Sequence, residues 1–370
     1  MLLKNCNLLS SEGVFVKTDL QFEEKIQKIA PNLSEENSID LEGKTVVPGL
    51  IDIHSHGAMG KDASDGDPAA MEILSNYYAR VGVTSWCPTT MTLKEETLMQ
   101  AISAIKSYEK PCGAKVAGIY LEGPFFHHSK RGAQAEENLA TPDVAMFERL
   151  RKHSGDNIAV LALAPDLEGG VELIKEGSKH CTVALGHTAA DYDTAMTAFA
   201  NGASLAVHLY NGMMPFGHRS PNVVGAAYDS GAFVELICDG LHIHPSVIRV
   251  TFGLFGKKMV LISDSLRCAG MPDGEYELGG QPIVMNDGKA TLLNGTLAGS
   301  SIGLLDAVRN CISFGIPMAD AFYAGSTAPA LALGKGDQIG SLEVGKCADF
   351  LVLDKDLNLV STYVDGKKVV

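Results

Sequence analysis

Long hydrophobic segments and blocks of basic residues are both missing from this sequence. No stretch approaches the roughly 20 apolar residues that a membrane-spanning helix needs. The 370 residues include 30 Lys and Arg against 44 Asp and Glu, and no Lys/Arg-rich block forms a basic patch. The resulting net charge of −14 argues against binding to a nucleic-acid backbone or to an anionic membrane surface. We therefore expect neither a nucleic acid nor a membrane as a partner.

Paired cysteine motifs are lacking as well. The eight cysteines are scattered, with no CxxC and no tight cluster, which is typical of reduced thiols. The first residues, 1–9, form a short apolar run broken by polar residues, without the apolar region and cleavage site of a signal peptide. These features predict a cytoplasmic protein.

A βα rhythm fills the middle of the chain, where short apolar runs are followed by a turn and then by a stretch of helical character. Eight such runs occur, at 51–54, 83–86, 116–121, 158–164, 182–185, 205–208, 233–238 and 259–263. Apolar strands that alternate with helices suit a parallel sheet covered on both faces, and eight of them predict a (β/α)8 barrel of the TIM type. An open doubly wound sheet is the alternative. The barrel is favoured because no GxGxxG or Walker-type loop follows the first strand.

The two ends of the chain are predicted to be β structure. Residues 1–48 contain short β-type pieces, and 340–370 are strand and turn, with a hairpin signal at Asp365-Gly366. We therefore expect an α/β fold with a barrel over 49–339 and a small β-sandwich domain formed by 1–48 and 340–370. Within the barrel region, residues 275–296 alternate with Gly-rich turns and predict an inserted β-hairpin.

Histidines and carboxylates stand where predicted strands end. His54 and His56 are two residues apart on the first strand, so their side chains point to the same side, although an isolated His-x-His decides nothing. Four further strand ends carry Glu122, His187, His208 and Asp264. In a (β/α)8 barrel these ends meet at the catalytic face, where imidazoles and carboxylates together form a site for a divalent transition metal.

Seven short pieces, spread over nearly the whole length, carry a family resemblance. They are 48–57 (PGLIDIHSHG), 121–125 (LEGPF), 185–188 (LGHT), 208–211 (HLYN), 239–242 (DGLH), 262–264 (ISD) and 296–300 (TLAGS). With them the chain resembles the N-acetylglucosamine-6-phosphate deacetylase family of the amidohydrolase superfamily. The first piece is general to the superfamily, whereas LEGPF and TLAGS are more particular to the family. The resemblance implies metal-dependent hydrolysis of the acetamide of N-acetylglucosamine-6-phosphate, which yields glucosamine-6-phosphate and acetate.

The resemblance also implies a ligand set for one or two metal ions per subunit. Glu122, His187 and His208 would bind one ion, and Glu122 would bridge to a second ion held by His54 and His56. Because imidazole and carboxylate suit either metal, zinc and iron are both expected.

Asp264 would complete this ligand set and serve as the catalytic acid/base. Its carboxylate would receive the proton of the attacking water and then donate it to the departing amine. The proton matters because an amine anion is a very poor leaving group.

Further residues are implied to bind the substrate. Arg219 corresponds to an arginine that binds the phosphate in the family and reaches the site of a neighbouring protomer. A homodimer or higher homo-oligomer is therefore expected. Asn211 and Gly212 would offer amide donors, and His242 a further contact.

Two positions depart from the family pattern. Ser220-Pro221-Asn222 follows the arginine, where the family often has an acidic residue and then Pro-Gly. Gln134 stands where some members have a histidine, and it would donate a hydrogen bond to the sugar or to the carbonyl.

Three alternatives remain open to different degrees. A deacetylase for N-acetylgalactosamine-6-phosphate would share every motif quoted. Dihydroorotase-like enzymes typically bridge two metals with a modified lysine on the fourth strand, and 158–165 contains no lysine. A non-catalytic amidohydrolase-like assembly protein would have lost metal ligands, whereas all six candidates are present here.

Overall fold

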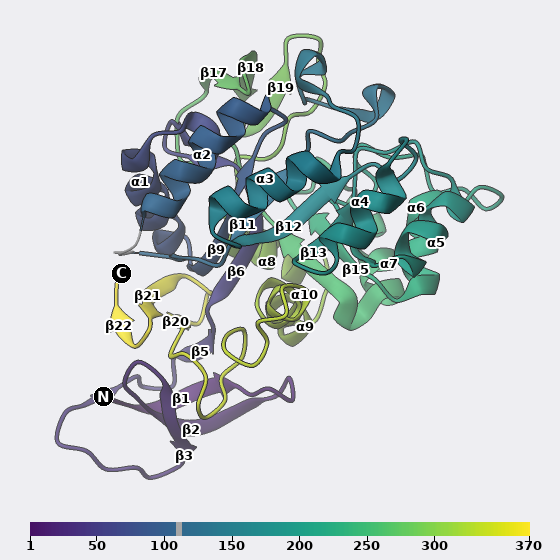
Figure 1. Cartoon of the computed structure of the whole chain (residues 1–370). Helices are drawn as coiled ribbons and strands as arrows, with labels where there is room; N and C mark the ends of the chain where they lie inside the picture. The colour runs from purple at the N-terminus through teal and green to yellow at the C-terminus, as the bar shows by residue number, and fades with distance from the viewer. Residues whose placement is uncertain (109–112) are drawn as a thin grey trace.

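Eight parallel strands follow one another around a barrel in the order in which they occur along the chain (Figure 1). The computed structural model describes residues 1–108 and 113–370. The barrel strands are β6 (Leu50–Ser55), β9 (Val83–Thr90), β11 (Ile119–Glu122), β12 (Ile158–Leu163), β13 (Thr182–Leu185), β14 (Ala203–Ala206), β15 (Phe233–Ile237) and β16 (Met259–Ile262). The short strand β10 (Lys115–Val116) also pairs with β9. The predicted (β/α)8 barrel is confirmed, and every predicted strand overlaps an observed one.

The seam between the first and last barrel strands is closed by few contacts. The backbone N–H of Asp264 donates to the carbonyl of His54 over 2.9 Å. Next to it, the backbone N–H of Ser263 donates to the side chain of Asp52 over 3.2 Å. This join places the ends of β6 and β16 side by side.

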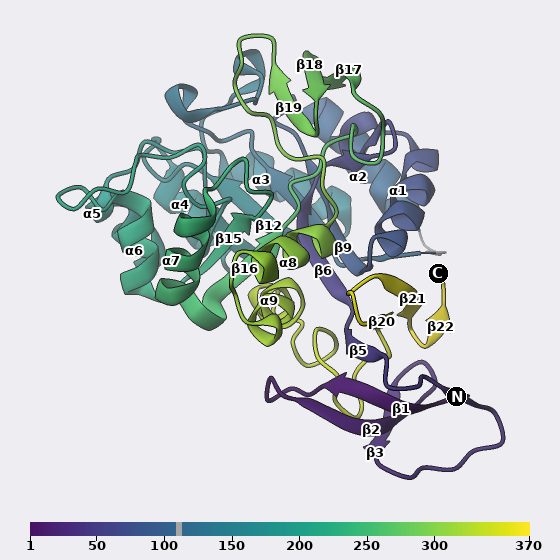
Figure 2. The same ribbon diagram turned by 180° about the vertical axis from the view of Figure 1, so that it is seen from behind.

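Helices follow the strands and cover the outside of the barrel (Figures 1 and 2). They are α1 (Pro68–Arg80), α2 (Glu95–Ser107), α3 (Val144–Ser154), α4 (Gly170–Gly177), α5 (Tyr192–Ala200), α6 (Asn222–Ser230), α7 (Pro245–Phe255) and α8 (Leu304–Ser313). Three of them begin at an aspartate, Asp67, Asp143 or Asp191, whose side chain accepts a hydrogen bond from a backbone N–H of the first turn. These caps fix where the helices start and, with them, the length of each preceding loop.

Further helical segments follow α8 or lie in loops. The α9 (Met318–Gly325) and α10 (Thr327–Ala332) helices pack against β6 and β16. Four short 3-10 segments are η1 (Ala63–Asp65), η2 (His128–Lys130), η3 (Glu136–Asn138) and η4 (Gly256–Lys258), and a two-residue strand pair is formed by β7 (Gly57–Ala58) and β8 (Lys61–Asp62). The α9–α10 pair thus lies over the seam.

A three-stranded antiparallel sheet is inserted between β16 and α8. Its strands are β17 (Gly274–Leu278), β18 (Gln281–Asn286) and β19 (Lys289–Leu292). The prediction of a single hairpin was therefore incomplete. Both turns have residues with positive φ, Gly279-Gly280 in the first and Asp287-Gly288 in the second, as two-residue hairpin turns require.

The two ends of the chain meet in one small sheet, as predicted. Its order is β22-β21-β20-β5-β1-β2-β3, with β4 beside β1. The strands are β1 (Leu2–Leu9), β2 (Phe15–Phe22), β3 (Ile26–Ala30), β4 (Ser38–Asp40), β5 (Thr45–Pro48), β20 (Phe350–Leu353), β21 (Leu359–Val364) and β22 (Lys367–Lys368). The hairpin signal at Asp365-Gly366 lies in the turn between β21 and β22.

This small sheet curves over itself and encloses its own core. Phe22 on β2 lies three strands from Phe350 on β20, which in a flat sheet would be about 14 Å. Their ring centroids are 5.0 Å apart, so the sheet is folded into a sandwich-like layer pair.

The chain enters the barrel through Gly49, where a Cβ would lie 2.3 Å from the Thr84 side chain. The exact bounds of the two domains stay a prediction.

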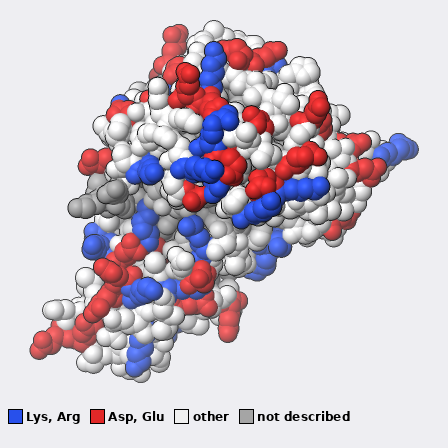
Figure 3. All heavy atoms as spheres, viewed as in Figure 1, with Lys and Arg blue, Asp and Glu red and all other residues white. Residues whose placement is uncertain are grey.

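Side chains of both charge signs are interspersed over the face of the molecule in Figure 3. Ion pairs such as Arg149 with Glu95 and Arg151 with Glu148 join neighbouring helices or turns. Among the residues that the structure describes, no helix is both long enough and apolar enough to cross a membrane.

Candidate metal centre

A cavity of about 220 Å³ opens at the carboxyl ends of the barrel strands. Of the site residues predicted from the sequence, all except His54 and Arg219 line it: His56, Glu122, Gln134, His187, His208, Asn211, Gly212, His242 and Asp264. His54 lies fully buried behind this lining. The predicted candidate ligands at the strand ends therefore come together around one cavity, as expected.

Three of the candidate ligands have backbone in the left-handed region. The φ angles are +46° for His187, +23° for His208 and +49° for Asp264. Non-glycine residues adopt such angles rarely and at a cost of about 1–3 kcal/mol each. Strain of this kind is concentrated at functional sites, where the surrounding structure holds a side chain in one direction.

Glu122 occupies the centre of the site and touches histidines with both carboxylate oxygens. Its Oε1 lies 3.1 Å from His187 Nε2 and 3.2 Å from His208 Nε2. Its Oε2 lies 3.2 Å from His56 Nε2 and accepts a hydrogen bond from Gln134 Nε2 at 2.5 Å. The Nε2 atoms of His187 and His208 are 3.1 Å apart, close to the separation of about 3.3 Å for two tetrahedral ligands of zinc. We call Glu122, His187 and His208 the first ligand group.

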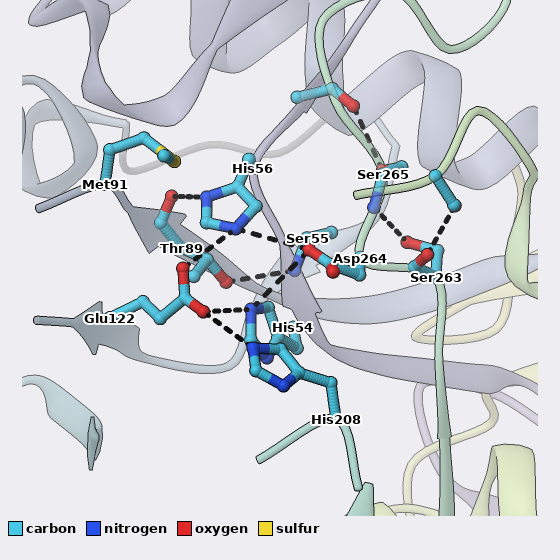
Figure 4. Close-up of polar contacts among 12 residues, drawn as sticks. His54, Ser55, His56, Thr89, Met91, Glu122, His208, Ser263, Asp264 and Ser265 are labelled. Carbon is cyan, nitrogen blue, oxygen red and sulfur yellow. Dashed lines mark hydrogen bonds and ion pairs between the residues drawn. The ribbon is translucent and has the colours of Figure 1, made fainter. Parts of the chain in front are cut away.

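A second ligand group consists of His54, His56 and Asp264, whose nearest ligand atoms all lie within 4.8 Å of one another (Figure 4). Asp264 Oδ1 is 3.4 Å from His56 Nε2 and 3.7 Å from His54 Nε2. His54 Nε2 is also 3.5 Å from Glu122 Oε1. Glu122 therefore stands between the two groups, with an oxygen facing each.

The ring orientations favour a cation at the centre. In three of the four histidines the Nδ1 atom faces an acceptor: Glu235 Oε2 at 2.9 Å for His54, the Thr89 carbonyl at 3.2 Å for His56, and the Lys130 carbonyl at 2.9 Å for His187. Neutral rings with a proton on Nδ1 present a lone pair on Nε2, so Nε2 atoms and carboxylate oxygens face one another as acceptors. Acceptors gathered in a buried site require protons or a metal ion between them. The donor set fits a divalent transition metal.

The electrostatics of the site follow from this crowding. Burial by itself would raise the pKa of Glu122, but His54, His187 and His208 together lower it well below its ordinary value. Burial works against a charge on His56 as well, yet hydrogen bonds to Asp264 and Glu122 raise its pKa to about 10. The pKa of Asp264 is lowered, because the nearby histidines outweigh its burial. A proton therefore occupies His56 when no metal is bound, and a metal ion would displace it.

Asn211 and Gly212 border the cavity beside His187. The amide of Asn211 donates to the His208 carbonyl over 3.2 Å. Gly212 has φ of +58°, and a Cβ there would lie 2.8 Å from His187 Nδ1. A side chain at this position would displace the ring, so glycine is required.

Hydrogen bonds fix the side chains of Gln134 and His242. The backbone N–H of Thr92 donates to Gln134 Oε1 at 2.8 Å, which turns the amide nitrogen toward Glu122. Gln134 was expected to contact substrate, and the structure adds a role in holding Glu122. His242 Nδ1 lies 2.6 Å from Asp239 Oδ2; burial would lower the pKa of His242, but this carboxylate raises it.

Arg219 does not reach the cavity of its own chain. It is exposed at the tip of a loop in which Gly217 and Ser220 exchange backbone hydrogen bonds at 3.0 and 3.1 Å. The loop projects from the barrel between β14 and α6. The expectation that Arg219 contacts substrate therefore depends on a second protomer.

Sequence reasoning missed several residues of the site. Glu235 is fully buried in β15 and holds His54, and a charged residue inside an apolar strand was the signal. Asp239 holds His242, although it was quoted only as part of a motif. Thr296, Leu297 and Gly299, which were also quoted only as part of a motif, line the cavity from the loop after the inserted sheet.

Residues 45–369 match the Amidohydrolase family. The chain belongs to the amidohydrolase family. It is 37% identical over 338 residues to N-acetylglucosamine-6-phosphate deacetylase of Vibrio furnissii, and the match covers 90% of this chain and 85% of that protein. It is also 37% identical over 331 residues to N-acetylgalactosamine-6-phosphate deacetylase of Escherichia coli O157:H7, at 88% of each. The resemblance drawn from short motifs is confirmed.

Solved structures of this family agree over the full length. N-acetylglucosamine-6-phosphate deacetylase from Pasteurella multocida superposes with a TM-score of 0.94 at 30% identity, covering 99% of this chain and 98% of that one. A mutant of the Mycobacterium smegmatis enzyme, in complex with N-acetyl-D-glucosamine-6-phosphate, has a TM-score of 0.94 at 27% identity, covering 100% of this chain and 99% of that one. Both the barrel and the small sheet of this chain are therefore present in these solved deacetylase structures.

Proposed function

We propose that this amidohydrolase removes the acetyl group from N-acetylglucosamine-6-phosphate and releases acetate and glucosamine-6-phosphate. One observation carries the proposal: Asp264 of the second ligand group lines an open cavity, and Glu122 of the first ligand group contacts His56 of the second. The deacetylase relatives from bacteria and vertebrates support the choice of substrate.

The first and second ligand groups are proposed to hold one divalent ion each, zinc or iron, with Glu122 between them. Imidazole and carboxylate ligands suit both metals. A bound ion would polarise the acetamide carbonyl and lower the pKa of water from about 15.7 to about 7.

Asp264 is proposed to move the proton. As its pKa is lowered, the side chain is an ionised base near neutral pH and takes a proton from the water that attacks the carbonyl carbon. The C–N bond then breaks, and Asp264 returns the same proton to the nitrogen, which departs as a neutral amine. Asn211, Gly212 and His242 lie at the cavity wall, where they would orient the sugar.

The phosphate is proposed to be bound by Arg219 of a second copy of the chain. Exposed apolar side chains lie near the Arg219 loop and along α7: Phe216, Tyr228, Val247, Val250 and Leu254. Apolar surface of this kind is a typical subunit interface. A homodimer that buries it would carry the exposed arginine toward the neighbouring cavity. A cytoplasmic location is also proposed, and the cysteines of the described residues are all free thiols.

N-acetylgalactosamine-6-phosphate is the second candidate substrate, because the deacetylase named for it is as similar to this chain, at 37% identity, as the N-acetylglucosamine-6-phosphate deacetylase of Vibrio furnissii. A non-catalytic role is disfavoured, since the six candidate ligands are present and buried together.

The proposal is tested by measuring kcat/KM for acetate release on protein of known metal content. The substrates are N-acetylglucosamine-6-phosphate, its galacto epimer and N-acetylglucosamine without phosphate. We expect the gluco phosphate to be preferred by at least tenfold over the other two. Equal efficiency with and without phosphate would refute the substrate class, and preference for the galacto epimer would select the second candidate.

A further inference from the structure

Glu235 is a buried carboxylate without a Lys or Arg partner among the ion pairs of the described residues. Its side chain is 0% exposed, and its neighbours Val234 and Leu236 on β15 are equally buried. An ionised carboxylate in such a place is costly unless hydrogen bonds or a positive charge offset it. Its presence therefore needs a specific cause.

The hydrogen bonds of Glu235 lead to both ligand groups. Oε2 accepts from His54 Nδ1 at 2.9 Å and from the backbone N–H of His208 at 3.2 Å. The carbonyl of Glu235 accepts from the N–H of Leu209 at 2.8 Å, so β15 also holds the segment after His208. The side chain of His54 depends on Glu235, whereas His208 is touched only at its backbone.

The His54 ring has little other support for its direction. Tyr120 packs against it with centroids 4.5 Å apart, which limits tilting but accepts no proton from Nδ1. The Nε2 atom has no hydrogen-bond partner among the described residues and faces Glu122 and Asp264 at 3.5 and 3.7 Å. A carboxylate on Nδ1 fixes the tautomer that leaves a lone pair on Nε2, and it increases the basicity of that lone pair.

We infer that Glu235 is a positioning residue that makes the second ligand group able to bind a metal ion, by orienting and polarising His54. The inference rests on the proposed two-ion site. It predicts that a substitution of Glu235 weakens metal binding at the second ligand group but not at the first. The reason is that no side chain of the first ligand group forms a hydrogen bond or ion pair with Glu235 within the described chain.

The test titrates metal-free protein with Co²⁺, which takes the same nitrogen and oxygen ligands and reports each site by visible absorption and by calorimetry. Glu235→Gln keeps the size and an acceptor oxygen but removes the charge, and Glu235→Leu removes the acceptor as well. Asp349→Asn, at a buried carboxylate of the small sheet, is the matched control.

Wild-type protein and Asp349→Asn are expected to bind two Co²⁺ ions. Glu235→Gln should weaken one of the two sites by about 10- to 100-fold and leave the other within about threefold, with Glu235→Leu at least as severe. Equal weakening of both sites would mean a general structural role and would overturn the inference, as would two unchanged sites or a wild type with a single site. Selective loss in a protein that deacetylates nothing would support the inference and refute the proposed function instead.

Discussion

The Asp264→Asn substitution keeps the size of the side chain but removes its ability to hold a proton. Asp264 Oδ1 lies 3.4 Å from His56 Nε2, and an amide oxygen in that place would still face the second ligand group. General acid–base catalysis by one residue contributes typically about 10²–10⁴-fold. Because the proposed mechanism uses this carboxylate for two successive transfers, we expect kcat to fall by about 10⁴-fold, equivalent to about 5 kcal/mol of barrier.

The assay couples acetate release to metal analysis of the same samples. Asp143→Asn, at the capping position of α3 and not among the residues that line the cavity, serves as the control and should retain wild-type kcat. A substituted enzyme with wild-type metal content and kcat within tenfold of wild type would refute the role of Asp264 in proton transfer.

Three further predictions concern the phosphate, the dimer and the small sheet. Arg219→Met should raise KM for the phosphorylated substrate about 10- to 100-fold without changing kcat/KM for unphosphorylated N-acetylglucosamine; an equal effect on both would contradict the assignment. Val250→Asp should convert the proposed dimer to a monomer in light scattering and raise the same KM, and a variant that stays dimeric would contradict the proposed interface. Lys115→Ala leaves the buried Asp349, 2.9 Å from the lysine, unpaired and should lower the free energy of unfolding by about 3 kcal/mol at pH 7. Burial raises the pKa of Asp349 above its unfolded value of about 4. Its destabilising charge is therefore absent below about pH 4 and appears as pH rises through the folded pKa. Urea unfolding in which the variant loses the same free energy of unfolding at pH 4 and at pH 7 would contradict this.

The barrel could be predicted from sequence because each strand is an apolar run bounded by a turn. Residues 158–164 and 259–263 illustrate this, since β12 and β16 are almost wholly buried. The terminal hairpin was predicted from Asp365-Gly366, and the same dipeptide at Asp287-Gly288 could have revealed the third strand of the insert. A one-hairpin interpretation overlooked a local signal that was present.

The ligand residues could be found because a barrel brings strand ends together whatever lies between them. Their partners could not, since contacts such as His54 with Glu235 join residues 181 positions apart and depend on the packed geometry of two strands. The orientation of Gln134 is set by a backbone N–H of Thr92, which no residue pattern encodes. Arg219 is exposed because it lies on a hairpin loop, and the motif match did not predict the conformation of that loop.

Metal-dependent hydrolysis at this site is tested most directly by acetate release from N-acetylglucosamine-6-phosphate before and after removal of metal. We expect chelation to reduce the rate by at least about 10³-fold and stoichiometric Zn²⁺ or Fe²⁺ to restore it, because the buried ligand groups would hold a cation beside Asp264. Acetate release at an unchanged rate by metal-free protein would contradict the account.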